Sequence, residues 1–137
     1  MTHQATIISF ANHKGGVGKT TTTASVGSIL ASLGKKVLLV DMDAQSNLTS
    51  SLLKNEEVES TIYDALSASC RGAAYNLAVY PITENLDIVP SSLRLASADL
   101  ELSSVMAREH LLSDVLQSQV TNYDYILIDC PPSLGLL

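Results

Sequence analysis

The chain is poor in aromatic residues, proline and cysteine. It has 137 residues, with no tryptophan, one phenylalanine, four prolines and two cysteines. So few prolines, with seven glycines, exclude a collagen-like or proline-rich segment. Two cysteines cannot form the dense disulfide framework of a small secreted domain. A charged fraction of 16% beside 46% hydrophobic residues argues against a disordered chain, so we expect one folded domain.

Basic residues and long apolar runs are also scarce. Eight Lys and Arg stand against fourteen Asp and Glu, a net charge of −6, which excludes a chain-wide basic surface for DNA or anionic lipid but not a local basic patch. Apolar stretches such as Val37–Val40 are far shorter than the roughly 20 residues of a membrane span. The start, Met1–Gln4, lacks the basic and apolar parts of a signal peptide. We therefore expect a reduced, cytoplasmic protein with no membrane partner.

The first forty residues have the pattern of a strand, a helix and a second strand. Ala5–Ala11 is apolar and β-branched, and Lys36–Asp41 is an apolar run without alternation, which is typical of strands covered on both faces. Between them, Thr20–Leu33 has helical spacing and ends at Gly34, a favourable C-cap residue. The apolar stripe predicted for this helix is Val26, Ile29, Leu30 and Leu33. The order predicts a right-handed βαβ unit.

The remaining chain continues the alternation of helices and strands. The further strands predicted are Ala78–Ile82, Leu86–Pro90 and Tyr125–Asp129. The further helices predicted are Thr61–Ala68, Leu93–Leu102 and Arg108–Val120. This order indicates an α/β fold with a mostly parallel sheet, and we expect Tyr125–Asp129 to form an exposed edge of that sheet.

A glycine-rich loop joins the first strand to the first helix. Glycines allow the backbone N–H groups of such a loop to surround a polyphosphate, and the following helix N-terminus attracts the same anion. We expect Lys19 to contact the β- and γ-phosphates, Thr20 to bind Mg²⁺ and Thr21 to contact the α-phosphate. The nucleotide-binding residues predicted here are Lys14, Gly15, Gly16, Val17, Gly18, Lys19, Thr20 and Thr21.

The loop departs from the ordinary Walker A pattern, which has glycine where this chain has His13. An additional lysine, Lys14, follows that position. The alternative is a glycine-rich turn that only joins a strand to a helix. The strand before and the helix after favour the phosphate-binding interpretation.

Three aspartates come at or just after the ends of predicted strands. Asp41 ends the second strand, Asp43 lies two residues beyond it, and Asp129 ends the last strand. Because ligands of open α/β sheets lie beyond the carboxyl ends of the strands, all three acids could face the phosphates. Mg²⁺ needs few protein ligands beside water and phosphate oxygens, and Thr20 with Asp129 would suffice. Taken singly, each aspartate could instead be a turn or cap residue.

Together these motifs resemble the ParA/Soj-type partition ATPases, in the MinD/ParA group of deviant Walker A P-loop proteins. The resemblance is carried by Lys14–Thr20, Asp41–Gln45 and Ile128–Gly135. It implies a P-loop NTPase-like, three-layer α/β/α fold with a mostly parallel sheet. It also implies that residues 1–137 are the N-terminal part of a single such domain, ending after the Walker B strand.

The resemblance further assigns cofactors and residue roles. The cofactors implied are ATP and Mg²⁺. Lys14 would reach the phosphates of a partner subunit, Lys19 would bind phosphate, and Asp43 would orient the hydrolytic water, which makes these the catalytic residues. Thr20 would bind the metal directly, and Asp41 and Asp129 would bind it through water. Gly135 would lie in a switch region that responds to the γ-phosphate.

The implied function is ATP hydrolysis in plasmid or chromosome partitioning. The implied partners are a second copy in a nucleotide sandwich dimer, a ParB-like centromere-binding protein, and nonspecific DNA bound through a C-terminal half that this chain lacks. Family members are cytoplasmic and associate with the nucleoid when ATP is bound. The chain itself is expected to hydrolyse ATP weakly or not at all. Two alternatives stay open: a nucleotide-binding fragment without turnover, and a MinD-like membrane-cycling regulator lacking its anchor.

Overall fold

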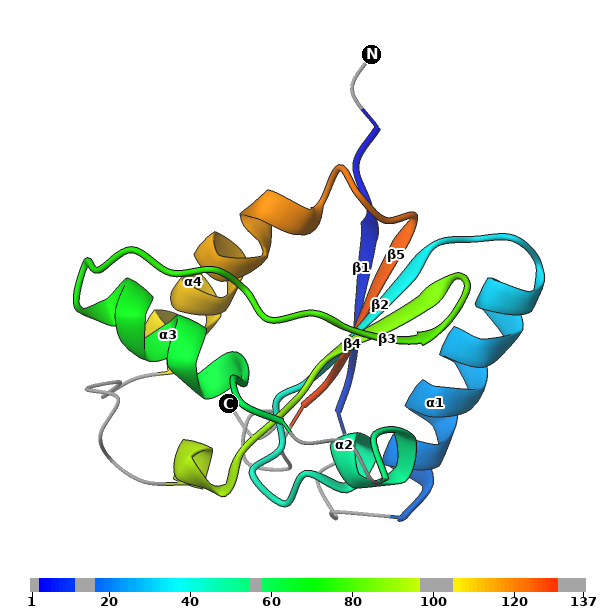
Figure 1. Cartoon of the computed structure of the whole chain (residues 1–137), viewed down its shortest axis with the longest axis horizontal. Coiled ribbons are helices and arrows are strands. Elements are labelled where there is room, and N and C mark those ends of the chain that lie inside the picture. Colours follow the sequence, from blue (N-terminus) through cyan, green and yellow to red (C-terminus); the bar gives the residue numbers. More distant parts are fainter. Residues whose placement is uncertain (1–2, 12–16, 55–57, 97–104, 131–137) are drawn as a thin grey trace.

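A computed structural model of the chain describes residues 3–11, 17–54, 58–96 and 105–130 and shows one sheet with helices on both faces (Figure 1). The strands are β1 (Thr6–Phe10), β2 (Val37–Asp41), β3 (Tyr80–Thr83), β4 (Leu86–Val89) and β5 (Tyr125–Asp129). The α-helices are α1 (Val17–Ser32), α2 (Asn47–Leu52), α3 (Ile62–Cys70) and α4 (Val105–Leu116). Two short 3-10 helices are η1 (Leu93–Ala96) and η2 (Gln117–Gln119).

The five strands have the order β1-β5-β2-β4-β3. β1, β5, β2 and β4 are parallel, and β3 pairs antiparallel with β4. The predicted α/β class with a mostly parallel sheet is confirmed. The prediction that Tyr125–Asp129 forms an exposed edge is wrong, because β5 lies between β1 and β2 and its residues Ile126 and Leu127 have no exposed surface. A run buried on both faces is what a central strand requires.

Helices cover the two faces of the sheet and create two apolar cores. α1 and α2 lie on one side, and α3 and α4 lie on the other (Figure 1). Alternate residues of the strands point to opposite faces. On the α1 side the buried strand residues are Val37, Leu39, Leu86, Ile88 and Leu127. On the α3 and α4 side they are Leu38, Val40, Val89, Ile126 and Ile128. This is the predicted three-layer arrangement.

α1 meets the sheet through small residues and through part of its predicted apolar stripe, since Val26 and Leu30 pack against the core on this side. Thr23 and Gly27 are buried, whereas Ile29 and Leu33 are 59% and 70% exposed. The predicted stripe was therefore wrong at these two positions. A Cβ added at Gly27 would lie 2.8 Å from Leu39 Cδ2, so the glycine allows the close approach of helix and sheet. The predicted C-cap is confirmed, since Gly34 follows the helix with a φ of 86°.

Two other elements differ from the sequence expectations. The helix predicted over Leu93–Leu102 begins as the 3-10 helix η1, and residues 97–104 lie outside the described residues. α2 was not predicted. The helix predicted from Thr61 is confirmed as α3, where Thr61 and Asp64 form a capping box that pairs the free N–H groups of the first turn.

Candidate functional site

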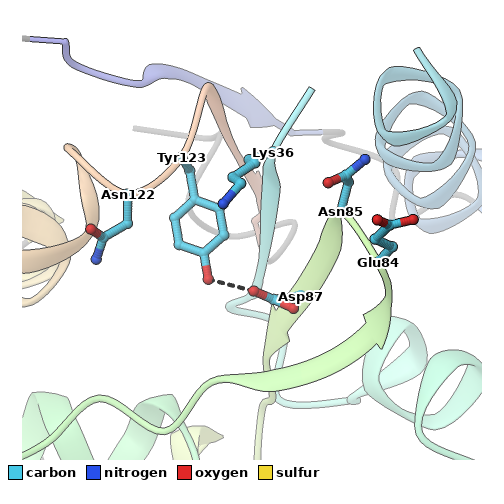
Figure 2. A pocket seen from close by; sticks show the side chains of 6 residues that line it. All are labelled: Lys36, Glu84, Asn85, Asp87, Asn122 and Tyr123. Carbon is cyan, nitrogen blue, oxygen red and sulfur yellow. Dashed lines mark hydrogen bonds between the residues drawn. The ribbon is translucent and has the colours of Figure 1, made fainter. Parts of the chain in front are cut away.

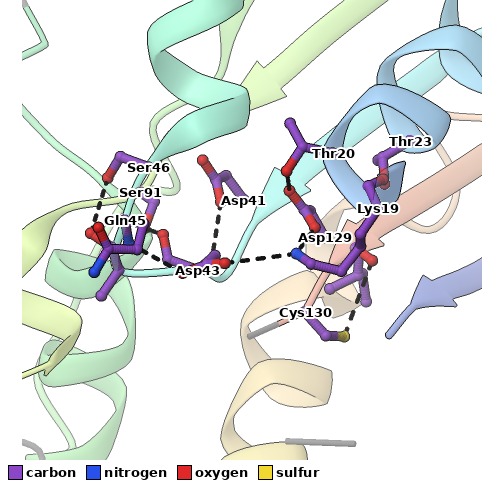
Figure 3. A network of polar contacts seen from close by, with 12 residues as sticks. Lys19, Thr20, Thr23, Asp41, Asp43, Gln45, Ser46, Ser91, Asp129 and Cys130 are labelled. Carbon is purple, nitrogen blue, oxygen red and sulfur yellow. Dashed lines mark hydrogen bonds and ion pairs between the residues drawn. The ribbon is translucent and has the colours of Figure 1, made fainter. Parts of the chain in front are cut away.

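The predicted acids and the first helix meet at one end of the sheet. β2 ends at Asp41 and β5 ends at Asp129, and these two residues are register partners in neighbouring parallel strands. α1 begins at Val17, so its N-terminal turn carries Lys19 and Thr20 to the same end (Figure 3). The topology therefore places a helix N-terminus, an ammonium group and carboxylates together, as the sequence predicted.

Lys19 lies at the centre of this cluster. Its side chain forms an ion pair with Asp129, and its Nζ lies 3.6 Å from Asp43 Oδ2 (Figure 3). Thr20 donates a hydrogen bond from Oγ1 to Asp129 Oδ2 over 3.0 Å. Lys19 is 7% exposed and Asp129 has no exposed surface. Burial removes most solvent screening, so the attraction between these charges is stronger here than on the surface.

The same groups have the chemistry that a magnesium nucleotide requires. A threonine hydroxyl and a carboxylate are oxygen ligands of the kind that Mg²⁺ prefers. The Lys19 ammonium group is a suitable partner for phosphate oxygens, and the N-terminal N–H groups of α1 add positive potential. Here Asp129 engages both Lys19 and Thr20, so it occupies the two groups that a nucleotide phosphate and its metal would use. The described residues therefore have the chemistry to bind phosphate together with Mg²⁺.

The carboxylate of Asp41 has other partners than that of Asp129. Its Oδ1 accepts a hydrogen bond from the Asp43 N–H over 3.1 Å. Its Oδ2 accepts from the N–H of Thr49 over 2.9 Å and from the hydroxyl of Thr49 over 2.7 Å. Burial raises the pKa of Asp41 from its usual value near 3.8 to about 6, against the lowering effect of these hydrogen bonds. Both oxygens of Asp41 are thus used within the fold, between β2 and α2.

Asp43 is held by backbone and side-chain groups. Its carboxylate Oδ1 accepts from the Gln45 N–H over 3.0 Å, and its other oxygen faces Lys19. Its carbonyl oxygen accepts from Ser91 Oγ over 2.7 Å (Figure 3). Sequence reasoning missed Ser91 and Thr49. No local signal identified them, because Ser91 lies 48 positions from Asp43.

Part of the predicted loop lies outside the described residues. Lys14, Gly15, Gly16 and the switch residue Gly135 lie outside the described residues. Gly18 lies in α1, and a Cβ there would meet nothing within 4 Å. Thr21 follows Thr20 in α1 and its side chain is exposed. The structure therefore brings together Lys19, Thr20, Asp43 and Asp129.

A hollow lies at the opposite end of the sheet from this cluster. It encloses about 300 Å³ and is lined by Lys36, Glu84, Asn85, Asp87, Asn122 and Tyr123 (Figure 2). The Tyr123 hydroxyl donates to Asp87 Oδ2 over 2.6 Å. Burial, with the hydrogen bond to Asp87, raises the pKa of Tyr123 above its usual value. None of the predicted site residues lines this hollow.

Comparison with known proteins decides the family. Residues 5–137 match the family AAA_31, an AAA domain. The chain belongs to this family. Over nearly its whole length it is also homologous to the Soj/ParA partition ATPases. None of the helices in the described parts of this AAA domain is long and apolar enough to span a lipid bilayer.

Two relatives illustrate the similarity. The sporulation initiation inhibitor protein Soj of Bacillus subtilis (strain 168) is 47% identical over 132 residues, which are 96% of this chain and 51% of that protein. The chromosome partitioning protein ParA of Myxococcus xanthus (strain DK1622) is 44% identical over 133 residues, which are 96% of this chain and 46% of that protein. The AAA domain described here thus spans about half the length of the curated relatives it matches.

Solved structures share the fold. Cobyrinic acid a,c-diamide synthase from Mycobacterium smegmatis, with bound ATP analog and magnesium, has a TM-score of 0.80 at 34% identity and is matched over 96% of this chain and 55% of its own. A plasmid partition protein from Borrelia burgdorferi has a TM-score of 0.78 at 32% identity, over 97% of this chain and 60% of its own. The predicted P-loop NTPase-like fold is confirmed by these similarities.

Proposed function

We propose that this chain is the phosphate-handling, N-terminal part of a single ParA-like ATPase domain that acts in plasmid or chromosome partitioning. The observation that carries the proposal is the buried cluster in which Lys19 and Thr20 of α1 meet Asp129 at the end of β5. Homology to the Soj and ParA proteins supports the partition role. A neighbouring structure with bound ATP analog and magnesium supports the choice of ligand.

Each residue of the cluster has a distinct role in this proposal. Lys19 would pair with phosphate oxygens in place of Asp129, and Thr20 and Asp129 would hold Mg²⁺, Asp129 through a water molecule. Magnesium supplies charge neutralisation at the phosphate oxygens. Asp43 orients the attacking water toward the γ-phosphate. Because both oxygens of Asp41 already accept hydrogen bonds, we assign it to the support of Asp43 in preference to a magnesium-bound water.

The role of Asp43 can be separated from nucleotide binding. In the complete protein, Asp43→Ala should leave ATP binding intact and slow hydrolysis, because the carboxylate acts on water rather than on the nucleotide. ATP affinity is measured by calorimetry and hydrolysis by phosphate release. Loss of binding in this variant would contradict the assigned role.

An ATP-dependent dimer is a further part of the proposal. By family resemblance, Lys14 contacts the phosphates bound to the partner subunit, so Lys14→Ala should preserve monomer binding of ATP and prevent the dimer. Light scattering with and without nucleotide measures this. The further proposed partners are a ParB-like protein and nonspecific DNA, and the DNA is bound through the C-terminal half. The protein is proposed to be cytoplasmic, and its ATP-bound form to associate with the nucleoid.

A second candidate function is nucleotide binding without turnover. It is favoured by the fact that the chain spans about half the length of its curated relatives. The 137-residue chain is then expected to bind ATP but to hydrolyse it weakly or not at all. Robust phosphate release by this chain, abolished by Lys19→Ala, would favour the ATPase function over nucleotide binding without turnover.

A further inference from the structure

The backbone N–H and carbonyl of Asp43 both form hydrogen bonds with side chains, those of nearby Asp41 and of Ser91, 48 residues away. The Asp43 N–H donates to Asp41 Oδ1 over 3.1 Å, and its carbonyl oxygen accepts from Ser91 Oγ over 2.7 Å and from the N–H of nearby Ser46 over 2.8 Å. Asp41 is the last residue of β2, and Ser91 follows β4, the next strand in the sheet. The peptide groups on the two sides of Asp43 are therefore fixed from two neighbouring strands.

Thr49 joins these two contacts into one network. Its hydroxyl donates to Asp41 Oδ2 over 2.7 Å and accepts from the Ser91 N–H over 2.9 Å. Asp41, Thr49 and Ser91 are 0%, 8% and 5% exposed, so water has little access to these hydrogen bonds. Networks of buried hydrogen bonds whose members are all paired are rigid, and loss of one member weakens the others.

We propose that Ser91 is a positioning residue that, with Thr49 and Asp41, holds the carboxylate of Asp43 in place beside Lys19. With its backbone fixed, Asp43 keeps Oδ1 on the Gln45 N–H at 3.0 Å and Oδ2 at 3.6 Å from Lys19 Nζ. Acids that orient water must be held to within about 0.5 Å, and the residues that lock them contribute without touching substrate. This inference rests on the proposed function, since it deepens the role given there to Asp43.

Amide hydrogen exchange in the nucleotide-free chain tests the network directly. Two N–H groups report on it: that of Asp43 on the backbone, and that of Gln45 on the carboxylate. In Ser91→Ala both N–H groups should exchange at least about tenfold faster, because the hydrogen bond from the Ser91 hydroxyl to the Asp43 carbonyl is gone. The central β2 amide of Leu39 should be unchanged. Ser32→Ala is the matched control, because the Ser32 hydroxyl also donates to a backbone carbonyl, that of Ile29, but at the far end of α1.

A second variant keeps the test decisive if Ser91→Ala loses general stability. Thr49→Val has nearly the same shape but removes the hydroxyl that joins Asp41 to Ser91. It should accelerate the same two amides, and the double variant should add little to either single one. Restoration of slow exchange in Ser91→Thr, which retains a hydroxyl, would further support a role for the hydrogen bond.

Three results would overturn the proposal. One is equal acceleration at Leu39, which would make the effect global. Another is faster exchange at Asp43 with no change at Gln45, because the carboxylate would then be held without Ser91. The third is simple additivity of Ser91→Ala and Thr49→Val. The exchange measurements use no nucleotide. A failure of the wild-type chain to bind ATP would therefore refute the proposed function without changing the outcome of the exchange measurements.

Discussion

Lys19 and Asp129 lie 110 positions apart in the sequence and form a buried ion pair at the carboxyl end of the sheet. The pair joins the first turn of α1 to the last residue of β5. A buried charge without its partner is costly, so each residue depends on the other in the nucleotide-free chain. In the proposed function a magnesium nucleotide would replace this pairing: phosphate would pair with Lys19, and Asp129 would face the metal.

This relationship predicts a loss of stability in Lys19→Met. The substitution keeps most of the side-chain volume but leaves the Asp129 carboxylate buried without its cation, which typically costs about 3–5 kcal/mol in the free energy of unfolding. Urea denaturation measures the loss. The double variant Lys19→Met/Asp129→Asn should recover much of it, because no charge then stays unpaired. Equal stability of wild type and Lys19→Met would show that the pair does not contribute.

The raised pKa of Asp41 predicts that the stability of the chain depends on pH. The Asp41 carboxyl group titrates near pH 6 when folded, against a usual value near 3.8. Between these values the folded chain binds more protons than the unfolded chain, so the contribution of Asp41 to the unfolding free energy falls as pH rises from about 4 to about 6 and is level above. The whole change corresponds to about 3 kcal/mol.

The comparison that isolates this effect is wild type against Asp41→Asn. Other carboxylates titrate in both proteins, so the difference between their unfolding free energies reports on Asp41 alone. From about pH 4 to about pH 7, wild type should lose roughly 3 kcal/mol relative to the variant. Urea denaturation at these two pH values is the measurement. Parallel pH profiles would contradict the raised pKa.

Gly27→Ala should destabilise the chain although alanine favours helices. In an exposed helix interior the change would gain about 1 kcal/mol. Here the new Cβ would lie 2.8 Å from Leu39 Cδ2 and 3.4 Å from Leu86 Cδ1, and both leucines are buried. Overpacking of this kind costs about 1–3 kcal/mol, so the net effect is a lower melting temperature. Ser28→Ala, at the exposed neighbouring position, is the control, and a Gly27→Ala chain more stable than wild type would refute the close approach.

Tyr123→Phe should affect stability without affecting the nucleotide site. It removes the hydroxyl that donates to Asp87 over 2.6 Å, a partly buried hydrogen bond to a charged group that is worth about 1–2 kcal/mol. The hollow around it lies at the opposite end of the sheet from Lys19, so ATP affinity should not change (Figure 2). Thermal denaturation and calorimetry measure the two quantities. Tyr75→Phe, at a more exposed tyrosine, serves as control.

The strands and the acids at their ends could be predicted because both are local features. Buried parallel strands such as β2 and β5 are continuous apolar runs; Asp41 and Asp129 are their last residues, and Asp43 lies two residues beyond β2. The order of the strands is not local. The same apolar run is compatible with a central strand or an edge covered by helices, and the sequence did not distinguish these for β5.

The predictions that failed concern contacts between distant residues. Helical periodicity shows which residues of α1 share a face, but it does not show which face meets the sheet. Thr23 and Gly27 are buried in that contact and Val26 and Leu30 pack beside them, whereas Ile29 and, just beyond the helix, Leu33 are exposed. Likewise, Ser91 forms hydrogen bonds with Thr49, 42 positions away, and with Asp43, 48 positions away. The sequence around Ser91 has no pattern that predicts these contacts.

The most direct test of the account is a calorimetric titration of Mg²⁺-ATP into the 137-residue chain, into Lys19→Ala and into Asp43→Ala. We predict that wild type and Asp43→Ala bind. Lys19→Ala should lose at least about a hundredfold in affinity, because a charge-assisted phosphate contact is removed. Absence of binding by the wild-type chain, or equal binding by wild type and Lys19→Ala, would contradict the claim that the cluster around Lys19 is a nucleotide site.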